Sequence, residues 1–317
     1  MSATASAPAL LDPRKFADPD LTARGERRAR VALAALSTLW FNTGTVCNLT
    51  CRTCYIESSP RNDRLAYLSA AEVAGFLDEI ARDRLPTSEI GFTGGEPFMN
   101  PELPAMLHEA LSRGFQVLVL TNAMRPMRKQ QADLLALRER FGTRLRLRVS
   151  LDHYAAPVHE AERGRRSWQP AIEGLRWLAA HGFAVDVAGR LLSGEPEAVL
   201  RAGYARLFAD LGLPIDAFDP VRLMLFPEMD ASRDVPEITE ACWGILHRSP
   251  DSVMCASSRM VVRRQGAPRP AVLACTLLAY DGRFELGATL AEAGGSVALN
   301  HPHCARFCVL GGAACSR

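Results

Sequence analysis

The sequence lacks any run of uncharged apolar residues that approaches the ~18 to 20 needed to span a membrane. Its first sixteen residues hold an acidic residue and prolines where a secretory signal needs a continuous apolar segment. The chain also lacks an excess of either charge, because 37 Lys and Arg residues stand against 35 Asp and Glu residues, a net charge of +2. A protein that binds nucleic acid usually has a basic excess or a clustered basic stripe. We therefore expect a cytoplasmic protein without a membrane anchor, and we disfavour nucleic acid as its main partner.

Cysteine is not scarce, but it is unevenly placed. The nine cysteines among the 317 residues are an odd number, so they cannot all pair as disulfides within the chain, and a chain of this length does not need such bonds to be stable. Three of them lie between residues 47 and 54, residues 55–241 contain none, and six follow between residues 242 and 315. We therefore expect reduced cysteines that form two separate sites.

Between the two cysteine groups, short apolar runs alternate with helical patterns, which is typical of βα units around a parallel sheet. One helix has a clear start, because Ser69 and Glu72 form a capping box, and the next is expected to begin with Asn100 as N-cap and Pro101 as its first residue. The expected strands lie near 38–43, 88–93, 115–121, 144–151, 183–190 and 220–226, and further helices lie near 128–140, 169–181 and 195–211.

After about residue 227 this alternation stops, and residues 251–290 predict hairpin-like strands around turns that contain glycine and proline. The expected divisions are therefore an N-terminal extension (1–36), a βα domain (37–235) and a cysteine-rich C-terminal domain (236–317).

The first cysteine group, Cys47, Cys51 and Cys54, lies in a loop directly after the first expected strand, which is where a βα barrel places its chemistry. A structural zinc site usually needs four ligands, and no histidine or fourth cysteine lies nearby. Three thiolates on an iron–sulfur cubane leave one iron without a protein ligand, so that iron can take a substrate or cofactor.

With this CX3CX2C pattern after one strand and Gly94-Gly95-Glu96-Pro97 after the next, the chain resembles the radical S-adenosylmethionine (SAM) enzyme superfamily over about residues 38–227. The resemblance implies an α/β fold, a partial (β/α)6 TIM-like barrel. It also implies a [4Fe-4S] cluster on the three cysteines whose open iron binds the amino and carboxylate groups of SAM. Reduction then cleaves the sulfonium and yields a 5′-deoxyadenosyl radical.

The resemblance also implies a set of SAM-binding residues at the strand ends. The glycine turn would face the methionine ammonium, Ser150 and Asp152 would lie near the ribose, and Arg190 would pair with the carboxylate. Many members have an aromatic residue before the third cysteine, whereas this chain has Thr53 there and Tyr55 just after it. The expected cofactor-binding residues are Tyr55, Gly94, Gly95, Glu96, Pro97, Thr121, Asn122, Ser150, Asp152 and Arg190.

Strand alternation assigns faces, because successive side chains of a strand point to opposite sides. In the fourth strand the apolar residues share one face, while Arg146, Arg148, Ser150 and Asp152 share the other. The barrel interior is therefore expected to be polar and rich in arginine. Arg148 and Arg222 are candidates for binding an anionic substrate group, since guanidinium suits carboxylate and phosphate. The alternative is an internal ion-pair network with Glu89, Arg146 and Asp186.

The second cysteine group, with its close pairs around a hairpin region, is typical of a metal or cluster site. Cys275 followed by Phe284-Glu-Leu-Gly287 resembles, in part, the auxiliary-cluster extensions called SPASM and twitch domains. The expected ligands of a second [4Fe-4S] cluster are Cys255, Cys275, Cys304 and one of Cys308 or Cys315. Zinc on four of these cysteines is the main competitor, since tetrahedral thiolate sites also suit it.

Two clusters together suggest a radical oxidoreductase: the radical abstracts hydrogen from the substrate, a base takes a proton, and the auxiliary cluster accepts an electron or anchors the substrate. The base candidates are Asp152, His153, Asp186 and Glu228. The first expectation for the substrate is a small polar or anionic molecule, with flavodoxin or ferredoxin as electron donor. The alternatives are maturation of a ribosomal peptide, for which no obvious leader-binding domain is seen, a redox-neutral epimerisation or bond formation, and a non-catalytic iron–sulfur or zinc protein.

Overall fold

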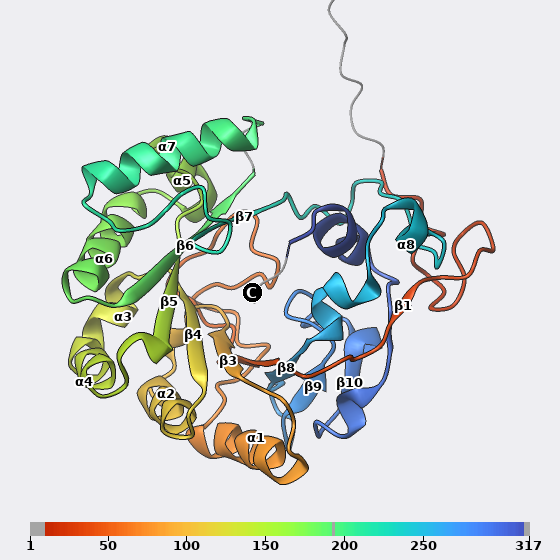
Figure 1. Cartoon of the computed structure of the whole chain (residues 1–317), viewed down its shortest axis with the longest axis horizontal. Coiled ribbons are helices and arrows are strands. Elements are labelled where there is room, and N and C mark those ends of the chain that lie inside the picture. The colour runs from red at the N-terminus through yellow and green to blue at the C-terminus, as the bar shows by residue number, and fades with distance from the viewer. Residues whose placement is uncertain (1–9, 192–193, 314–317) are drawn as a thin grey trace, which may run out of the picture.

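The computed structural model describes residues 10–191 and 194–313, so the predicted ligand Cys315 lies outside the described residues. Its centre is one nine-stranded sheet with the strand order β10-β9-β8-β2-β3-β4-β5-β6-β7. The six strands β2 to β7 are mutually parallel and curve into an open barrel (Figure 1). They are β2 (Thr38–Asn42), β3 (Glu89–Thr93), β4 (Gln116–Thr121), β5 (Leu145–Ser150), β6 (Ala184–Arg190) and β7 (Leu223–Phe226). This confirms the expected partial barrel and its six strands.

The C-terminal strands extend this sheet. β8 (Ser258–Val262) pairs in parallel with β2, while β9 (Ala271–Leu273) and β10 (Glu285–Gly287) follow as antiparallel neighbours. The predicted hairpin around residues 266–268 is confirmed as the β8–β9 connection. A seventh parallel strand was not expected, because β8 is distant in sequence and no local pattern indicates its partner.

Helices cover the outer, convex side of the sheet (Figure 1). They are α1 (Ala70–Asp83), α2 (Leu103–Ser112), α3 (Arg125–Lys129), α4 (Gln131–Phe141), α5 (Ala156–Arg163), α6 (Trp168–Ala180) and α7 (Glu197–Asp210). The short α8 (Cys242–Ile245) lies apart from this layer, towards β1 (Figure 1). The capping box of α1 is confirmed, since the Ser69 Oγ accepts from Glu72 N–H and the Glu72 carboxylate accepts from Ser69 N–H. No described helix is long and apolar enough to cross a membrane.

Two helix predictions need correction. α2 begins at Leu103, two residues later than predicted, because Asn100 Oδ1 accepts from Glu102 N–H at 2.9 Å and caps the turn that precedes the helix. The predicted helix 128–140 is two helices, α3 and α4, which meet at Gln130. α5 was not predicted, and it carries residues of the candidate site described below.

The apolar residues form two cores, one between the sheet and the helices and one on the concave side. On the concave side Trp40, Leu118 and Met260 are fully or almost fully buried sheet residues. Gly91 leaves room for the indole, since a Cβ there would lie 2.3 Å from Trp40 Cε3. The expected polar, arginine-rich interior is therefore correct only for the β5–β7 side, and the interior beside β2, β4 and β8 is apolar.

The N-terminal segment is fastened to the C-terminal part of the chain. β1 (Arg30–Val31) pairs antiparallel with β11 (Val297–Ala298). The Arg28 side chain is fully buried and donates to the carbonyls of Asp18 and Leu21, and its ion pair with Glu237 has an Nη2–Oε1 distance of 2.6 Å. Glu237 also accepts from the N–H groups of Phe16 and Ala23. One carboxylate thus holds two loops of the N-terminal segment against residues 235–238.

We expect the Glu237→Gln substitution to lower the free energy of unfolding by roughly 3 to 5 kcal/mol, because it leaves the buried Arg28 guanidinium without a counter-charge. The exposed Glu240, three residues along, provides the matched control Glu240→Gln, for which we expect a change within ~0.5 kcal/mol. Chemical denaturation of both variants checks this, and equal losses in the two would contradict it.

Candidate active site

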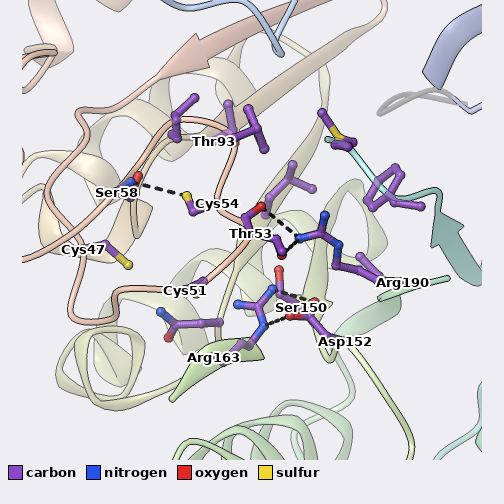
Figure 2. A pocket seen from close by; sticks show the side chains of 18 of the residues that line it. Cys47, Cys51, Thr53, Cys54, Ser58, Thr93, Ser150, Asp152, Arg163 and Arg190 are labelled. Carbon is purple, nitrogen blue, oxygen red and sulfur yellow. Dashed lines mark hydrogen bonds and ion pairs between the residues drawn. The ribbon is translucent and has the colours of Figure 1, made fainter. Parts of the chain in front are cut away.

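A cavity of about 160 Å³ opens where the parallel strands end. Figure 2 shows the first cysteine group on one side of it and Asp152, Arg163 and Arg190 on the other. Of the residues predicted from the sequence, those that line it are Cys47, Cys51, Cys54, Tyr55, Gly94, Gly95, Thr121, Asn122, Ser150, Asp152 and Arg190. Parallel strands bring these side chains together because all their carboxyl ends lie at one edge of the sheet.

The three cysteines sit in the loop after β2. Backbone N–H groups point at two of the sulfurs: Leu49 N–H donates to Cys47 Sγ at 3.4 Å, and Ser58 N–H donates to Cys54 Sγ at 3.3 Å. Burial raises the pKa of Cys47 to about 12 and also raises the pKa of Cys51, so the free thiols stay protonated at neutral pH. A metal cluster that binds here must therefore displace their protons.

The arrangement of these thiols suits a cluster. All three line one cavity, yet among residues 10–191 and 194–313 no three His, Cys, Asp or Glu side chains gather closely enough to hold a single metal ion. In a cubane each thiolate would bind a different iron. The donor set of three sulfurs leaves a fourth position open.

The glycine turn after β3 packs directly against the loop that leads into the cysteines. Gly95 N–H donates to Gly44 O at 2.8 Å, and Glu96 N–H donates to Val46 O at 3.2 Å. Gly94 has φ of +146°, and a Cβ on Gly95 would lie 2.4 Å from Val46 O. Glycine is required here because the two backbones touch, and the amides of Gly95 and Glu96 hold the cysteine loop.

Glu96 and Pro97 do not line the cavity. The buried Glu96 carboxylate accepts from Thr121 Oγ1 and Asn122 N–H, both at 2.8 Å, and burial raises its pKa to about 7. Pro97 is the first residue of a 3₁₀ turn, Pro97–Met99. Glu96 therefore joins the end of β3 to the end of β4.

Two arginines form the opposite wall. Arg163, at the end of α5, makes a two-point ion pair with the buried Asp152, with Nε–Oδ2 at 2.9 Å and Nη2–Oδ1 at 3.0 Å. Arg190, at the end of β6, donates to both the carbonyl and the hydroxyl of Thr53 (Figure 2). Thr53 and Arg52 also bind the buried carboxylate of Glu162 on α5. The residue that departs from the usual aromatic thus links the cysteine loop to β6 and α5.

The remaining predicted base and substrate residues lie outside the cavity lining. Asp186 is fully buried among three arginines, with Arg146 Nη1 at 3.2 Å, Arg222 Nη1 at 3.3 Å and Arg148 Nη2 at 3.9 Å. Arg148 and Arg222 therefore face Asp186, as the alternative of an internal ion-pair network predicts.

His153 and Glu228 are engaged elsewhere. His153 Nε2 lies 3.3 Å from a Glu195 carboxylate oxygen, and its Nδ1 accepts from Ala155 N–H. Glu228 pairs with Arg233 at 2.9 Å. Of the four base candidates only Asp152 lines the cavity, and it does so as the partner of Arg163.

The second cysteine group lies in segments that also contribute Leu277 and Phe307 to the cavity lining. Cys255 lies in a 3₁₀ turn before β8, Cys275 follows β9, and a π-helix, Cys304–Leu310, carries Cys304 and Cys308 one turn apart. Burial raises the pKa of Cys255 to about 12 and that of Cys304 well above its usual range, and repulsion from Cys275 adds to both. Three of the predicted ligands are thus close in space.

A buried arginine lies beside this group. Arg259 on β8 is fully buried and donates to the carbonyls of Cys255 at 2.6 Å, Ser258 at 2.8 Å, Ala293 at 2.8 Å and Gly295 at 3.1 Å. Within the described parts of the chain no carboxylate pairs with it. Its charge is therefore balanced by carbonyl dipoles alone, close to the thiols of Cys255 and Cys275.

Sequence reasoning missed Arg163, Glu162 and the role of Thr53. The available signal for α5 was weak: Pro157 stands near its start, but the helix is only eight residues long and its apolar spacing is irregular. A residue that reaches the site from such a helix is found only once the helix is placed.

The comparisons with known proteins agree with this geometry. The sequence model of the radical SAM superfamily matches residues 41–197. The chain is 34% identical over 143 residues to the antilisterial bacteriocin subtilosin biosynthesis protein AlbA of Bacillus subtilis, covering 45% of this chain and 30% of AlbA. It is 32% identical over 138 residues to the mycofactocin maturase MftC of Mycobacterium ulcerans, covering 44% and 35%. The chain thus aligns with about a third of the length of these curated relatives.

Two solved structures share the fold. The structure of native anSMEcpe with bound AdoMet has a TM-score of 0.59 at 12% identity and covers 81% of this chain and 79% of that one. Streptococcus suis SuiB bound to S-adenosylmethionine also has a TM-score of 0.59, at 11% identity, and covers 80% and 64%. At such low identity the likeness concerns the fold.

We expect Asp186→Asn to lower the free energy of unfolding by roughly 3 to 5 kcal/mol, because three arginines then lose their shared carboxylate in a buried place. The exposed Asp210→Asn at the end of α7 is the control and should change stability by less than ~0.5 kcal/mol. Thermal and chemical denaturation measure both. Unchanged stability with lost turnover would instead make Asp186 the base.

Proposed function

Since this chain belongs to the radical SAM superfamily, we propose that it cleaves S-adenosylmethionine reductively and uses the radical to modify a peptide. One observation carries the proposal: a single cavity is lined by the three cysteines of the first group and by Leu277 and Phe307, which belong to the segments that carry the second group. A substrate in this cavity lies between two cysteine sites.

Cys47, Cys51 and Cys54 would hold the first [4Fe-4S] cluster. A cluster held there would supply the electron for reductive cleavage of S-adenosylmethionine, and a small electron carrier such as flavodoxin or ferredoxin would reduce it. The N–H groups that donate to Cys47 and Cys54 stabilise thiolate charge. The glycine turn holds the cysteine loop in place by its backbone hydrogen bonds to residues 44 and 46.

The polar wall would hold the SAM molecule itself. Arg190 presents a guanidinium that suits the methionine carboxylate, and its Nε is buried without a hydrogen-bond partner in the described residues. Asp152 and Ser150 would form hydrogen bonds with the ribose hydroxyls, with the Asp152 carboxylate held in place by its ion pair with Arg163. Thr121, Asn122 and Tyr55 complete this side of the cavity.

A peptide fits the observations better than the small anionic molecule first expected from the sequence. Arg148 and Arg222, which were to bind an anion, face Asp186. AlbA is named for bacteriocin biosynthesis and MftC as a maturase, and SuiB has been solved with its precursor peptide SuiA, with a TM-score of 0.51 to this chain. These similarities support peptide modification as the class of reaction.

Cys255, Cys275, Cys304 and either Cys308 or Cys315 would hold the second cluster, which accepts an electron or anchors the peptide. The carbonyl-bound Arg259 supports this part of the proposal, because a cluster with four thiolates is anionic and would balance the buried guanidinium. We place the division between the radical-generating domain and this auxiliary domain near residue 235.

After anaerobic reconstitution, we expect the protein to bind about eight irons and to form 5′-deoxyadenosine from SAM with a chemical reductant. The Cys51→Ala variant should lose 5′-deoxyadenosine formation, because a cubane cannot keep its open iron with only two of the three thiolates. Cys242→Ala is the matched control, since this cysteine hydrogen-bonds to Thr239 away from the cavity, and it should keep both properties. Wild-type protein without SAM cleavage would contradict the proposal, and about four irons together with bound zinc would contradict the second cluster.

For the second site we expect Arg259→Gln to lower the reduction potential of the auxiliary cluster by roughly 60 mV or more, a tenfold change for one electron. The physical reason is that reduction adds negative charge, which a nearby buried cation favours. Redox titration followed by electron paramagnetic resonance measures this. Arg263→Gln is the control, because Arg263 follows the same strand but is neutralised by Glu72. Equal potentials in Arg259→Gln and the control would show that Arg259 does not act on a cluster.

A further inference from the structure

The active-site cavity has charged and apolar lining residues. The charged ones are Asp152, Arg163 and Arg190, which come from the loop after β5, from α5 and from β6. Five apolar ones, Ile56, Phe226, Met229, Leu277 and Phe307, form what we name the apolar wall, which begins beside Arg190 because Phe226 is its partner on β7. Each member comes from a segment that lies beside one of the cysteine groups or at the end of β7.

The apolar wall is held in place before any substrate arrives. The rings of Phe226 and Phe307 stack with their centroids 5.5 Å apart and an interplanar angle of 28°. Arg306, on the π-helix next to Phe307, donates to the carbonyls of Asp230 at 2.7 Å and of Arg233 at 3.0 Å. These bonds fix the loop after β7 to the π-helix, so the wall does not depend on a ligand for its shape.

A third segment joins the wall through Ile56. Tyr280 Oη donates to Ile56 O at 2.9 Å, which ties the residue after the first cysteine group to the segment that contains Leu277. Ile56 is 1% exposed and Leu277 is 5% exposed. Two charged side chains that neighbour the apolar wall in sequence are engaged elsewhere, Glu228 with Arg233 and Arg306 with backbone carbonyls.

We propose that the apolar wall receives an aliphatic or aromatic side chain of the peptide, and that this side chain is the one presented to the radical. The inference rests on the proposed function and deepens it by naming the substrate class. A charged or strongly polar group at this wall would lose its hydration without gaining a partner, whereas an apolar group gains from leaving water. The charged lining residues suit the cofactor, so the apolar wall is where the substrate side chain is selected.

The test uses the full chain, reconstituted with iron and sulfide and saturated with SAM. The probe is an equimolar mixture of N-acetyl-Gly-X-Gly amides in which X is each common amino acid, and retention through an ultrafiltration membrane is measured by mass spectrometry. We expect probes with leucine, isoleucine, methionine or phenylalanine at X to be retained at least ~10-fold over those with aspartate, lysine or serine.

Two neighbouring leucines give a matched pair of variants. Leu277 lines the cavity and Leu278 does not, yet each is 5% exposed, so both substitutions to alanine remove the same buried volume. We expect Leu277→Ala to prefer probes with larger side chains at X. The probe that the wild type prefers should be retained about tenfold less by this variant. Leu278→Ala should lose comparable stability and keep the wild-type preference.

Three results would overturn the inference. The first is retention of polar probes or of no probe, and the second is an equal retention profile for the two variants. The third is weaker binding of SAM to Leu277→Ala than to Leu278→Ala, which would assign the apolar wall to the adenine of SAM. Formation of 5′-deoxyadenosine is measured on the same preparations. Cleavage of SAM without apolar retention rejects this inference alone, whereas absence of cleavage rejects the proposed function.

Discussion

The contact between two backbones, the glycine turn after β3 and the loop before Cys47, is the constraint on which the site depends. The N–H groups of Gly95 and Glu96 donate to the carbonyls of Gly44 and Val46. A Cβ on Gly94 or Gly95 would lie within 2.5 Å of one of these carbonyl oxygens, so no larger residue fits there. This contact sets where the cysteine loop leaves the sheet. The Glu96 carboxylate also accepts from Thr121 and Asn122 at the end of β4, so three strand ends are positioned together.

Ion pairs and hydrogen bonds hold the other side of the cysteine loop. Glu162 on α5 binds Arg52 and Thr53, and Arg190 on β6 binds Thr53. The next residue after Glu162, Arg163, pairs with Asp152 beyond β5. The short helix α5 thus ties the cysteine loop to the end of β5, and Arg190 ties it to the end of β6.

The C-terminal part completes the cavity from the open side. It joins the same sheet through β8 and is fastened to the N-terminal segment by Arg28, Glu237 and the β1–β11 pair. The π-helix and the segment after Cys275 then bring Phe307 and Leu277 into the cavity lining.

The sequence by itself determined the six parallel strands, the capped helix α1, the cysteine loop and the glycine turn, because each leaves a local pattern: period-two alternation, a capping pair, or a fixed spacing. It also placed eleven predicted residues of the cavity, since the ends of parallel strands meet at one edge. Only the tertiary structure decided that β8 pairs with β2, that Arg148 and Arg222 form ion pairs with Asp186, and that Glu162 and Arg163 reach the site from α5. These depend on contacts between residues far apart in sequence, where a charged side chain has several partners within reach and only the packed chain selects one.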